Sequence, residues 1–257
     1  LPGKNYLVLA RTTSSNGDVP ANELGGYNMV VFKINNEGQT VNTNVYGGSG
    51  NDELWAVAPY KGKLVFAGHT NSPELGASDT SAWLMISDLD GNILNSWVYG
   101  GDMDQKFLDL IPIADSEFIA CGEAGVPADF WAVKLNMQGS LLWQKQYGGP
   151  ELETFKRATK IKNGIYLAGG TTEENGKLDC YIVDIDYSGK KLWDFSLGGS
   201  GMDWANEITQ NGYLCGFTNS NDGDVSGNHG GLCDGWIVKI IPPPNSTGLT
   251  TEERVET

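Results

Sequence analysis

Four acidic residues recur at nearly even spacing and are the side chains best suited to chemistry in this chain. Each lies shortly after a pair of glycines, and they are Asp52, Asp104, Glu153 and Asp203. Carboxylates gathered in one place repel one another unless they are hydrated, hydrogen-bonded or bound to a cation. One interpretation is a ligand or calcium site at a channel mouth. The other, which we prefer, is that each acid caps the glycine turn by accepting backbone N–H bonds.

A second acidic pattern occurs in two loops, one early and one late in the chain. Residues 221–225 (Asn-Asp-Gly-Asp-Val) align without gaps with residues 15–19 (Ser-Asn-Gly-Asp-Val). Divalent cations such as calcium prefer oxygen ligands, and the candidate ligands are Asn16, Asp18, Asp222 and Asp224. Asp-Gly-Asp is also an ordinary turn sequence, and the turn is the preferred interpretation.

The glycine pairs mark an internal repeat. A Tyr or Leu precedes Gly-Gly at residues 46–48, 99–101, 147–149 and 197–199, so the steps are 53, 48 and 50 residues. A fixed period near fifty indicates stacked or radial supersecondary units. The approximate units are 1–48, 49–101, 102–149, 150–199 and 200–241, followed by a Pro-rich tail at 242–257.

Each unit predicts four short strands. The second strand is apolar, as in residues 63–68, and the third opens on a small polar residue, usually with an aromatic residue two positions later, as in Asp129 and Trp131. Glycine turns about every ten residues and the lack of helical periodicity make the chain all-β. Four antiparallel strands per unit are the anatomy of a propeller blade. The predicted fold is therefore a five-bladed β-propeller with four-stranded antiparallel blades and incomplete first and last units.

Packing between the blades is expected to involve the repeated aromatic and small residues. One blade cannot bury both faces of its sheet, so neighbouring blades must stack. We expect the third-strand tryptophans to fill the space between blades. The Ala-Gly at the end of the second strand is expected to allow close contact between blades.

The two ends of the repeat differ from its middle. The first unit begins at its second strand, and the fifth is followed by Pro242–Pro244, which cannot join a hairpin ladder. One hypothesis is that residues 245–257 supply a missing strand at the seam between the fifth and first units and close the ring. The alternative is a loose tail.

The net charge and apolar content of the chain limit the classes of partner it is expected to bind. The chain has 257 residues, of which 40% are hydrophobic, and 17 basic against 32 acidic residues give a formal charge of −15. Such a surface repels nucleic acid and anionic membranes. No apolar run approaches the roughly 20 residues of a membrane span, and no signal segment opens the sequence. We expect a monomer with a glycan or protein ligand, no nucleic-acid partner and no membrane span.

The four cysteines lack a CxxC pair, so a zinc site is not expected. Cys121 and Cys215 share one repeat position, where we expect free thiols facing an apolar blade interface. Cys215 and Cys233 lie on adjacent predicted strands and would form a disulfide if the register brought them together.

The fullest copy of the repeat occupies residues 199–240. Its Gly-Gly-Ser-Gly is followed by an acid, then by Gly-Tyr-Leu-x-Gly-x-Thr-x-Ser-x-Asp-Gly-Asp-Val-Ser-Gly-x-His-Gly-Gly, then by Asp-x-Trp-Ile-Val-Lys. This pattern resembles the repeats of bacterial secreted and surface β-propeller proteins, and looser copies extend the resemblance over residues 5–240. The resemblance implies export to the periplasm, the cell surface or the medium, with a lipid anchor as one variant. It implies no reaction.

Three functions follow as hypotheses. The first is a non-catalytic scaffold that binds ligands with rim loops and the channel mouth, because the sequence has no Gly-x-Ser-x-Gly elbow, Walker loop or His/Glu metal motif. The second is a glycoside hydrolase or carbohydrate-binding propeller that uses the recurring acids. Catalysis would require two unlike carboxyl groups, whereas near-identical repeats supply like ones. The third is a structural module stabilised by calcium.

Overall fold

The computed structural model describes residues 5–20, 24–101, 103–114, 116–172 and 176–242. Within these residues the chain forms strands and one 3₁₀ turn, η1 (Pro73–Leu75), with no α-helix. The prediction of an all-β protein is confirmed. No helix in the described part of the chain is long and apolar enough to cross a membrane.

The strands form five antiparallel sheets in which each strand pairs with its neighbour in the sequence. The first sheet has β1 (Tyr6–Thr12), β2 (Asn28–Ile34) and β3 (Thr40–Tyr46); the second has β4 (Asp52–Tyr60), β5 (Lys63–Thr70), β6 (Ser81–Asp88) and β7 (Ile93–Tyr99); the third has β8 (Gln105–Ala114), β9 (Glu117–Ala124), β10 (Asp129–Asn136) and β11 (Leu141–Tyr147); the fourth has β12 (Glu153–Lys160), β13 (Gly164–Thr172), β14 (Leu178–Asp186) and β15 (Lys191–Leu197); the fifth has β16 (Asp203–Ile208), β17 (Tyr213–Thr218) and β18 (Asp234–Lys239).

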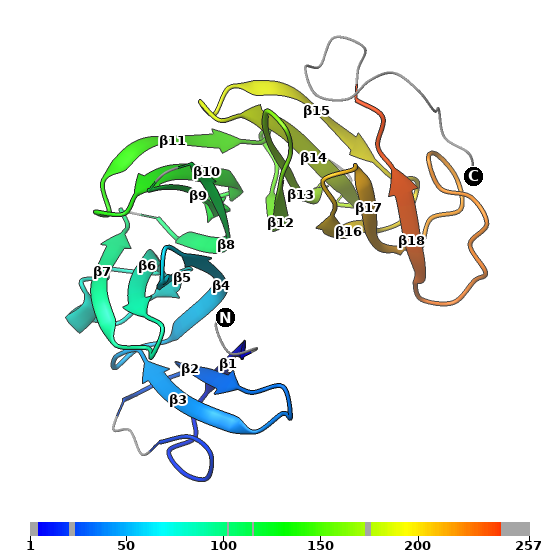
Figure 1. Ribbon diagram of the computed structural model, residues 1–257. Helices are drawn as coiled ribbons and strands as arrows, with labels where there is room; N and C mark the ends of the chain where they lie inside the picture. The colour runs from blue at the N-terminus through cyan, green and yellow to red at the C-terminus, as the bar shows by residue number, and fades with distance from the viewer. Residues whose placement is uncertain (1–4, 21–23, 102, 115, 173–175, 243–257) are drawn as a thin grey trace. The chain divides into compact units, whose positions relative to one another are not determined.

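The chain divides into two compact units, residues 1–112 and 113–257. The first unit holds the first and second sheets, and the second unit holds the fourth and fifth sheets and most of the third (Figure 1). The first and fifth sheets each have three described strands. The segment 245–257, considered for closing the ring, lies outside the described residues.

The first strand of the second, fourth and fifth sheets carries a β-bulge. The extra residue lies between Leu54 and Ala56 in β4, and corresponding bulges occur in β12 and β16. The carbonyl before each bulge bends towards the partner strand, so a Cβ built on Gly68 would lie 1.8 Å from the Glu53 oxygen. A side chain there is sterically impossible, which explains the second-strand glycine. The nearest atoms to Gly68 and Gly216 belong to their own sheets, so these two glycines accommodate a bulge instead of the expected contact between blades. A Cβ on Gly169 would also lie 3.0 Å from Phe130 of the third sheet, so that glycine serves both.

The outer hairpins share one turn built on an Asx residue and a glycine. In the second sheet the Asp88 Oδ1 accepts the N–H groups of Asp90 and Asn92, both at 2.9 Å. Gly91 then takes a φ of +90°, a conformation that favours glycine. Equivalent Asx residues hold the same turn in the first, third and fourth sheets, at Asn35, Asn136 and Asp186.

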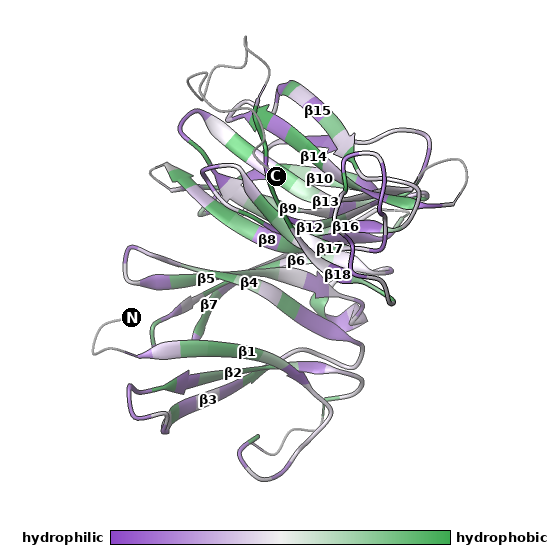
Figure 2. Ribbon diagram, turned by 90° about the vertical axis from the view of Figure 1, so that its right-hand side faces the viewer, coloured by the Kyte–Doolittle hydropathy of each residue, from purple (hydrophilic) through white to green (hydrophobic). Residues whose placement is uncertain are grey.

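Neighbouring sheets within each unit pack face to face through apolar side chains. In the first unit, Met29 and Val31 of β2 pack with Phe66, Trp83 and Met85 of the second sheet. A corresponding core joins the fourth and fifth sheets. Figure 2 shows that the strands carry these apolar stretches while most turns are polar. The expected interior role of the third-strand tryptophans holds for Trp83 and Trp131, which are buried.

The cysteines follow the repeat only in part. Cys121 and Cys180 are buried, whereas Cys215 and Cys233 are exposed, and none of the four forms a disulfide. The expectation that Cys215 lies within an apolar interface is thus not met in its sheet. Cys215 is paired with Ile237 in the β17–β18 register, so Cys233 lies beyond the end of that ladder and the two thiols are not opposite each other.

Candidate functional site

The Asp52 carboxylate is fully buried and is hydrogen-bonded to the turn that precedes it. The Gly48 N–H donates to Oδ2 at 2.8 Å, and the Ser72 hydroxyl donates to both oxygens at 2.9 and 3.0 Å. The Thr70 hydroxyl donates to Oδ1. A buried carboxylate costs several kcal/mol unless it is compensated by donors of this kind. Asp52 therefore joins the start of β4, the end of β5 and the glycine turn.

In the glycine turn before β4, each successive backbone N–H donates a hydrogen bond to a side-chain oxygen. After Gly48 donates to Asp52, the N–H of Ser49 donates to Glu74 and that of Gly50 donates to the Ser72 hydroxyl at 2.9 Å. The Asn51 N–H donates to the Asn71 side chain. Four consecutive backbone donors are thus satisfied by the protein's own oxygens.

The fifth sheet repeats this arrangement around Asp203, which is also fully buried. Gly199 N–H donates to its Oδ2 at 2.9 Å, Ser220 donates to the same oxygen at 2.7 Å, and Thr218 donates to Oδ1. Asp222 takes the place of Glu74, because its Oδ1 accepts the Ser200 N–H at 2.6 Å. This hydrogen bond lowers the pKa of Asp222 below its ordinary value.

Glu153 fills the same position in the fourth sheet with fewer donors. Its oxygens accept the Gly149 N–H at 3.2 Å and the Thr171 hydroxyl at 2.9 Å. Burial raises the pKa of Glu153, and the neighbouring Asp129 carboxyl adds to the increase, although Thr171 opposes it.

Asp104 does not belong to this set. The acids at 52, 153 and 203 stand four residues after the second glycine, whereas Asp104 stands only three residues after Gly101, and it is exposed. Gln105 is the equivalent residue, since its N–H donates to the Thr80 carbonyl as the N–H of Asp52 does to Tyr27. The sequence comparison missed this because it matched residue type instead of counting positions.

The hydroxyl partners of the acids were also missed, although the sequence contains their signal. Thr-Asn-Ser occurs at 70–72 and again at 218–220, directly after the second strands of the two sheets with the complete arrangement. In the third sheet the acid is replaced by Gln105, and Ala124 pairs with Asp129 where Thr70 pairs with Ser81. The acid and its hydroxyl partner are therefore absent together.

The first glycine of each pair leaves room for a polar contact between adjacent sheets. A Cβ on Gly47 would lie 2.1 Å from the Asn28 Oδ1 and 2.7 Å from the Asp52 Oδ2. A Cβ on Gly148 would lie 2.2 Å from oxygens of both Asp129 and Glu153. The first residue of a third strand thus meets the acid of the next sheet across this glycine.

The proposed metal ligands of the two acidic loops are turn residues. The Val225 N–H donates to the Asp222 carbonyl at 3.1 Å and the Asp224 N–H donates to the Gly198 carbonyl at 2.9 Å. The Val19 N–H likewise donates to the Asn16 carbonyl at 3.3 Å, and Asp18 is exposed. Within the described ranges no three potential ligands are grouped to hold a metal ion.

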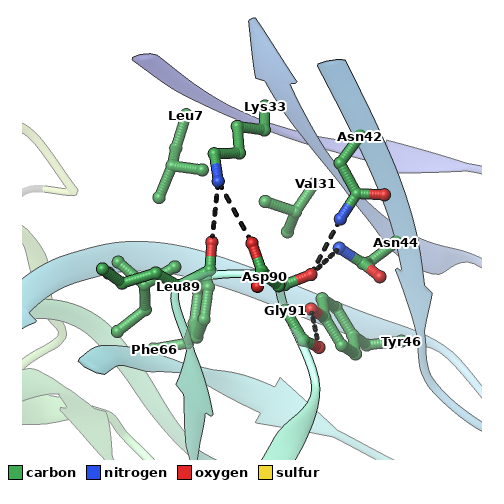
Figure 3. Close-up of a pocket in the computed structure, with 11 residues that line it drawn as sticks. Leu7, Val31, Lys33, Asn42, Asn44, Tyr46, Phe66, Leu89, Asp90 and Gly91 are labelled. Atoms are coloured by element: carbon green, nitrogen blue, oxygen red, sulfur yellow. Dashed lines mark hydrogen bonds and ion pairs between the residues drawn. The ribbon is translucent and has the colours of Figure 1, made fainter. Parts of the chain in front are cut away.

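The tyrosine of the Tyr-Gly-Gly motif ties one sheet to the next. The buried Tyr46 hydroxyl donates to the Gly91 carbonyl at 2.7 Å, and burial raises the pKa of Tyr46 to about 12. Figure 3 shows this contact in a pocket where Asn42 and Asn44 also donate to Asp90. In the second unit, the Tyr147 hydroxyl donates to Gly189 at 2.7 Å.

The same pocket holds a lysine over the turn. Lys33 Nζ donates to the Leu89 carbonyl at 3.1 Å and lies 3.4 Å from Asp90 Oδ1 (Figure 3). Every polar group drawn there is directed at the protein's own turn. We therefore interpret this pocket as a joint between the first and second sheets.

Asp184 is a buried acid on β14 of the fourth sheet. It is 4% exposed, and its Oδ1 has no hydrogen-bond partner among the described residues. Burial raises the pKa of Asp184 to about 7, while the Trp193 indole opposes the increase.

No family model matches the sequence, and no curated protein matches it. Among solved structures, the chain is similar to a neuraminidase-like protein from A/bat/Guatemala/164/2009, at 11% identity over 77% of this chain and 57% of that one, with a TM-score of 0.48. A subtype N10 neuraminidase-like protein of A/little yellow-shouldered bat/Guatemala/060/2010 is similar at 11% identity over 81% of this chain and 73% of that one, with a TM-score of 0.49. An ACO/RPE65 chimera is similar at 10% identity over 74% of this chain and 49% of that one, with a TM-score of 0.42.

Replacing Asp52 by Asn tests the structural role of the recurring acid. The amide keeps one acceptor but directs an NH₂ group at the donors of Gly48 and Ser72, so unfolding should become easier by about 1–3 kcal/mol. Urea denaturation followed by tryptophan fluorescence measures this loss. The matched control is Asp104→Asn, for which we expect a change within about 0.5 kcal/mol because the side chain is exposed. Equal effects of the two substitutions would refute the assignment.

Asp184→Asn should alter the pH dependence of stability. The folded chain raises the pKa of Asp184 from 3.8 to about 7, so the wild type loses stability as the pH rises through that range and the buried group ionises. The asparagine stays neutral. The free energy of unfolding of the variant relative to wild type should therefore increase from pH 4 to pH 7, by an amount on the order of a few kcal/mol at most, and then level off. A pH-independent difference would contradict the prediction.

Proposed function

We propose that this chain is an exported, five-bladed β-propeller scaffold that binds a glycan or protein and does no chemistry with its recurring acids. One observation carries the proposal. The oxygens of Asp52, Glu153 and Asp203 accept hydrogen bonds from the chain's own turns and hydroxyl groups, and all three residues are at most 2% exposed. Rim loops are then the surfaces left for a ligand. Export rests on the resemblance of the repeat alone.

The repeat supports a ring because its last sheet leaves uncovered a face that is buried elsewhere. On β17 and β18, Tyr213 is 47% exposed and Ile237 is 73% exposed. The equivalent residues of the fourth sheet, Tyr166 and Ile182, are 1% and 0% exposed because the fifth sheet covers them. The fifth sheet therefore exposes an apolar face of the kind that a following sheet covers in the rest of the repeat.

The first sheet shows the complementary feature. Tyr6 and Val8 of β1 are 59% and 42% exposed, whereas their equivalents in the second sheet, Leu64 and Phe66, are 2% and 0% exposed. In a closed ring the fifth and first sheets are neighbours, and these two faces are the ones that would meet. The ring closure is thus part of the proposal.

Cys215 reports on this closure because it lies on the same face as Ile237. In a closed ring its alkylation in the native protein should be at least tenfold slower than that of exposed Cys233, and should approach the slow rates of buried Cys121 and Cys180. Mass spectrometry after timed labelling gives the four rates. Reaction of Cys215 as fast as Cys233 in a monomer would refute closure. Protection that disappears on dilution would assign the face to a second copy instead.

The glycoside hydrolase remains the competing function, and it requires two reactive carboxyl groups on either side of a sugar. A panel of polysaccharides and oligosaccharides, assayed for both retention and release of reducing ends, separates the two functions. We expect no release above a protein-free blank. Release that is lost in Glu153→Gln and kept in Asp104→Asn, with both variants folded by circular dichroism, would establish catalysis and overturn the proposal.

A further inference from the structure

In the second unit two acids face each other across the first glycine at both joints between sheets, whereas the first unit has at least one neutral partner at each joint. The pairs are Asp179 with Asp203 at Gly198, where Asp203 has three donors, and Asp129 with Glu153 at Gly148. At the glycine between adjacent sheets, Asn28 faces Asp52, and Ser81 occupies the position across from Gln105. The corresponding residues between the third and fourth sheets are Asp129 and Glu153, and both are acids. The repeat therefore contains neutral residues at both positions: Asn28 and Ser81 correspond to Asp129, and Gln105 corresponds to Glu153.

The geometry places an oxygen of each carboxyl group beside the same glycine, Gly148. Oxygens of Asp129 and Glu153 both lie 2.2 Å from the position of a Cβ on Gly148. Glu153 is 2% exposed and Asp129 is partly buried, so water screens the pair only in part. Two ionised carboxylates this close repel strongly, whereas one proton between them turns the repulsion into a hydrogen bond.

The groups around the pair supply few compensating donors. Glu153 accepts from Gly149 and Thr171, compared with three donor groups for Asp52. The nearby Tyr181 hydroxyl donates to Asp194. The nearby Glu123 carboxylate accepts the Phe155 N–H at 2.9 Å and adds negative charge. No basic side chain is recorded against Glu153 among the described residues, and burial followed by Asp129 raises its pKa.

We infer that Glu153 retains its proton in the folded chain and donates it in a hydrogen bond to Asp129, so that the contact between β10 and β12 is linked to proton binding. The protonated pair acts as a hydrogen-bonded latch between the third and fourth sheets. Removing the proton at higher pH leaves two like charges in a buried joint and weakens that joint. The device depends on the local geometry and is independent of the proposed binding function.

The sign of the effect follows from the direction of the shift. A carboxyl group whose pKa is raised by folding stabilises the folded state only while it holds its proton, and this contribution is lost as the pH rises through the folded-state pKa. Asp129→Asn reproduces the Asn28–Asp52 arrangement and removes the repulsion. Each unit of pKa increase corresponds to about a tenfold change in the folding equilibrium constant.

Urea unfolding of wild type and Asp129→Asn between pH 5 and pH 9 tests the latch. We expect the folding equilibrium constant of the variant, relative to wild type, to rise at least tenfold over this range. Infrared difference spectra should show protonated-carboxyl absorption in the folded wild type at neutral pH that is weaker in Asp129→Asn and in Glu153→Gln, with the remainder from Asp184. Asp184→Asn is the matched control: it should lose only its own share and keep the part that the two pair variants lose.

Two results would overturn the inference. The first is a stability difference that does not change with pH, together with an unchanged carboxyl band. The second is a wild-type unfolding midpoint that rises with added calcium and falls with chelator while Asp129→Asn responds to neither, which would assign a cation to the pair. Glu153→Gln places a glutamine where the third sheet has Gln105. It therefore serves as the second variant for both measurements if Asp129→Asn does not fold.

Discussion

The buried carboxylate that follows three of the four glycine pairs is the interaction on which the repeat depends. Asp52 and Asp203 each accept hydrogen bonds from a glycine N–H, a threonine and a serine, and so join the glycine turn, the start of the first strand and the end of the second. The cost of burying the charge is offset only when all three segments are in place. The acid therefore makes the glycine turn, the start of the first strand and the end of the second mutually dependent. A carboxylate used in this way is poorly suited to act as a catalytic acid or base.

The Tyr-Gly-Gly motif now has a separate physical reason for each residue. The tyrosine hydroxyl bonds to the outer hairpin of the next sheet, as Tyr46 does with Gly91. The first glycine leaves room for the polar pair between sheets, and the second donates its N–H to the acid. The fourth copy carries Leu197 instead of tyrosine, and the fifth sheet that follows has no described outer hairpin to receive a hydroxyl. The motif thus encodes the joint between sheets as much as the turn itself.

The sequence predicted those features that depend on local pattern. Strand positions and hairpin turns follow from alternation and from Asx–Gly pairs, and the structure agrees, as at Asp88 and Gly91. The capping role of the acids was the preferred interpretation and agrees with the contacts of Asp52. Features that depend on exact register were missed. Asp104 was grouped with acids one position away, and Gly68 was assigned to contact between blades because a bulge in the partner strand cannot be seen from composition.

The two units differ in how they resolve the same electrostatic problem. At the joint between sheets Asp52 faces the neutral Asn28, whereas Asp203 faces Asp179 and has its charge met by Gly199, Thr218 and Ser220. Where the neighbour is Asp129, only a proton or a cation can neutralise the joint, and the described residues offer no cluster of three metal ligands. Near-identical repeats can therefore share a backbone while differing in their response to pH. In this chain, the variation between copies carries more functional information than the repeat that unites them, because the repeat fixes the scaffold and only the departures from it introduce new chemistry.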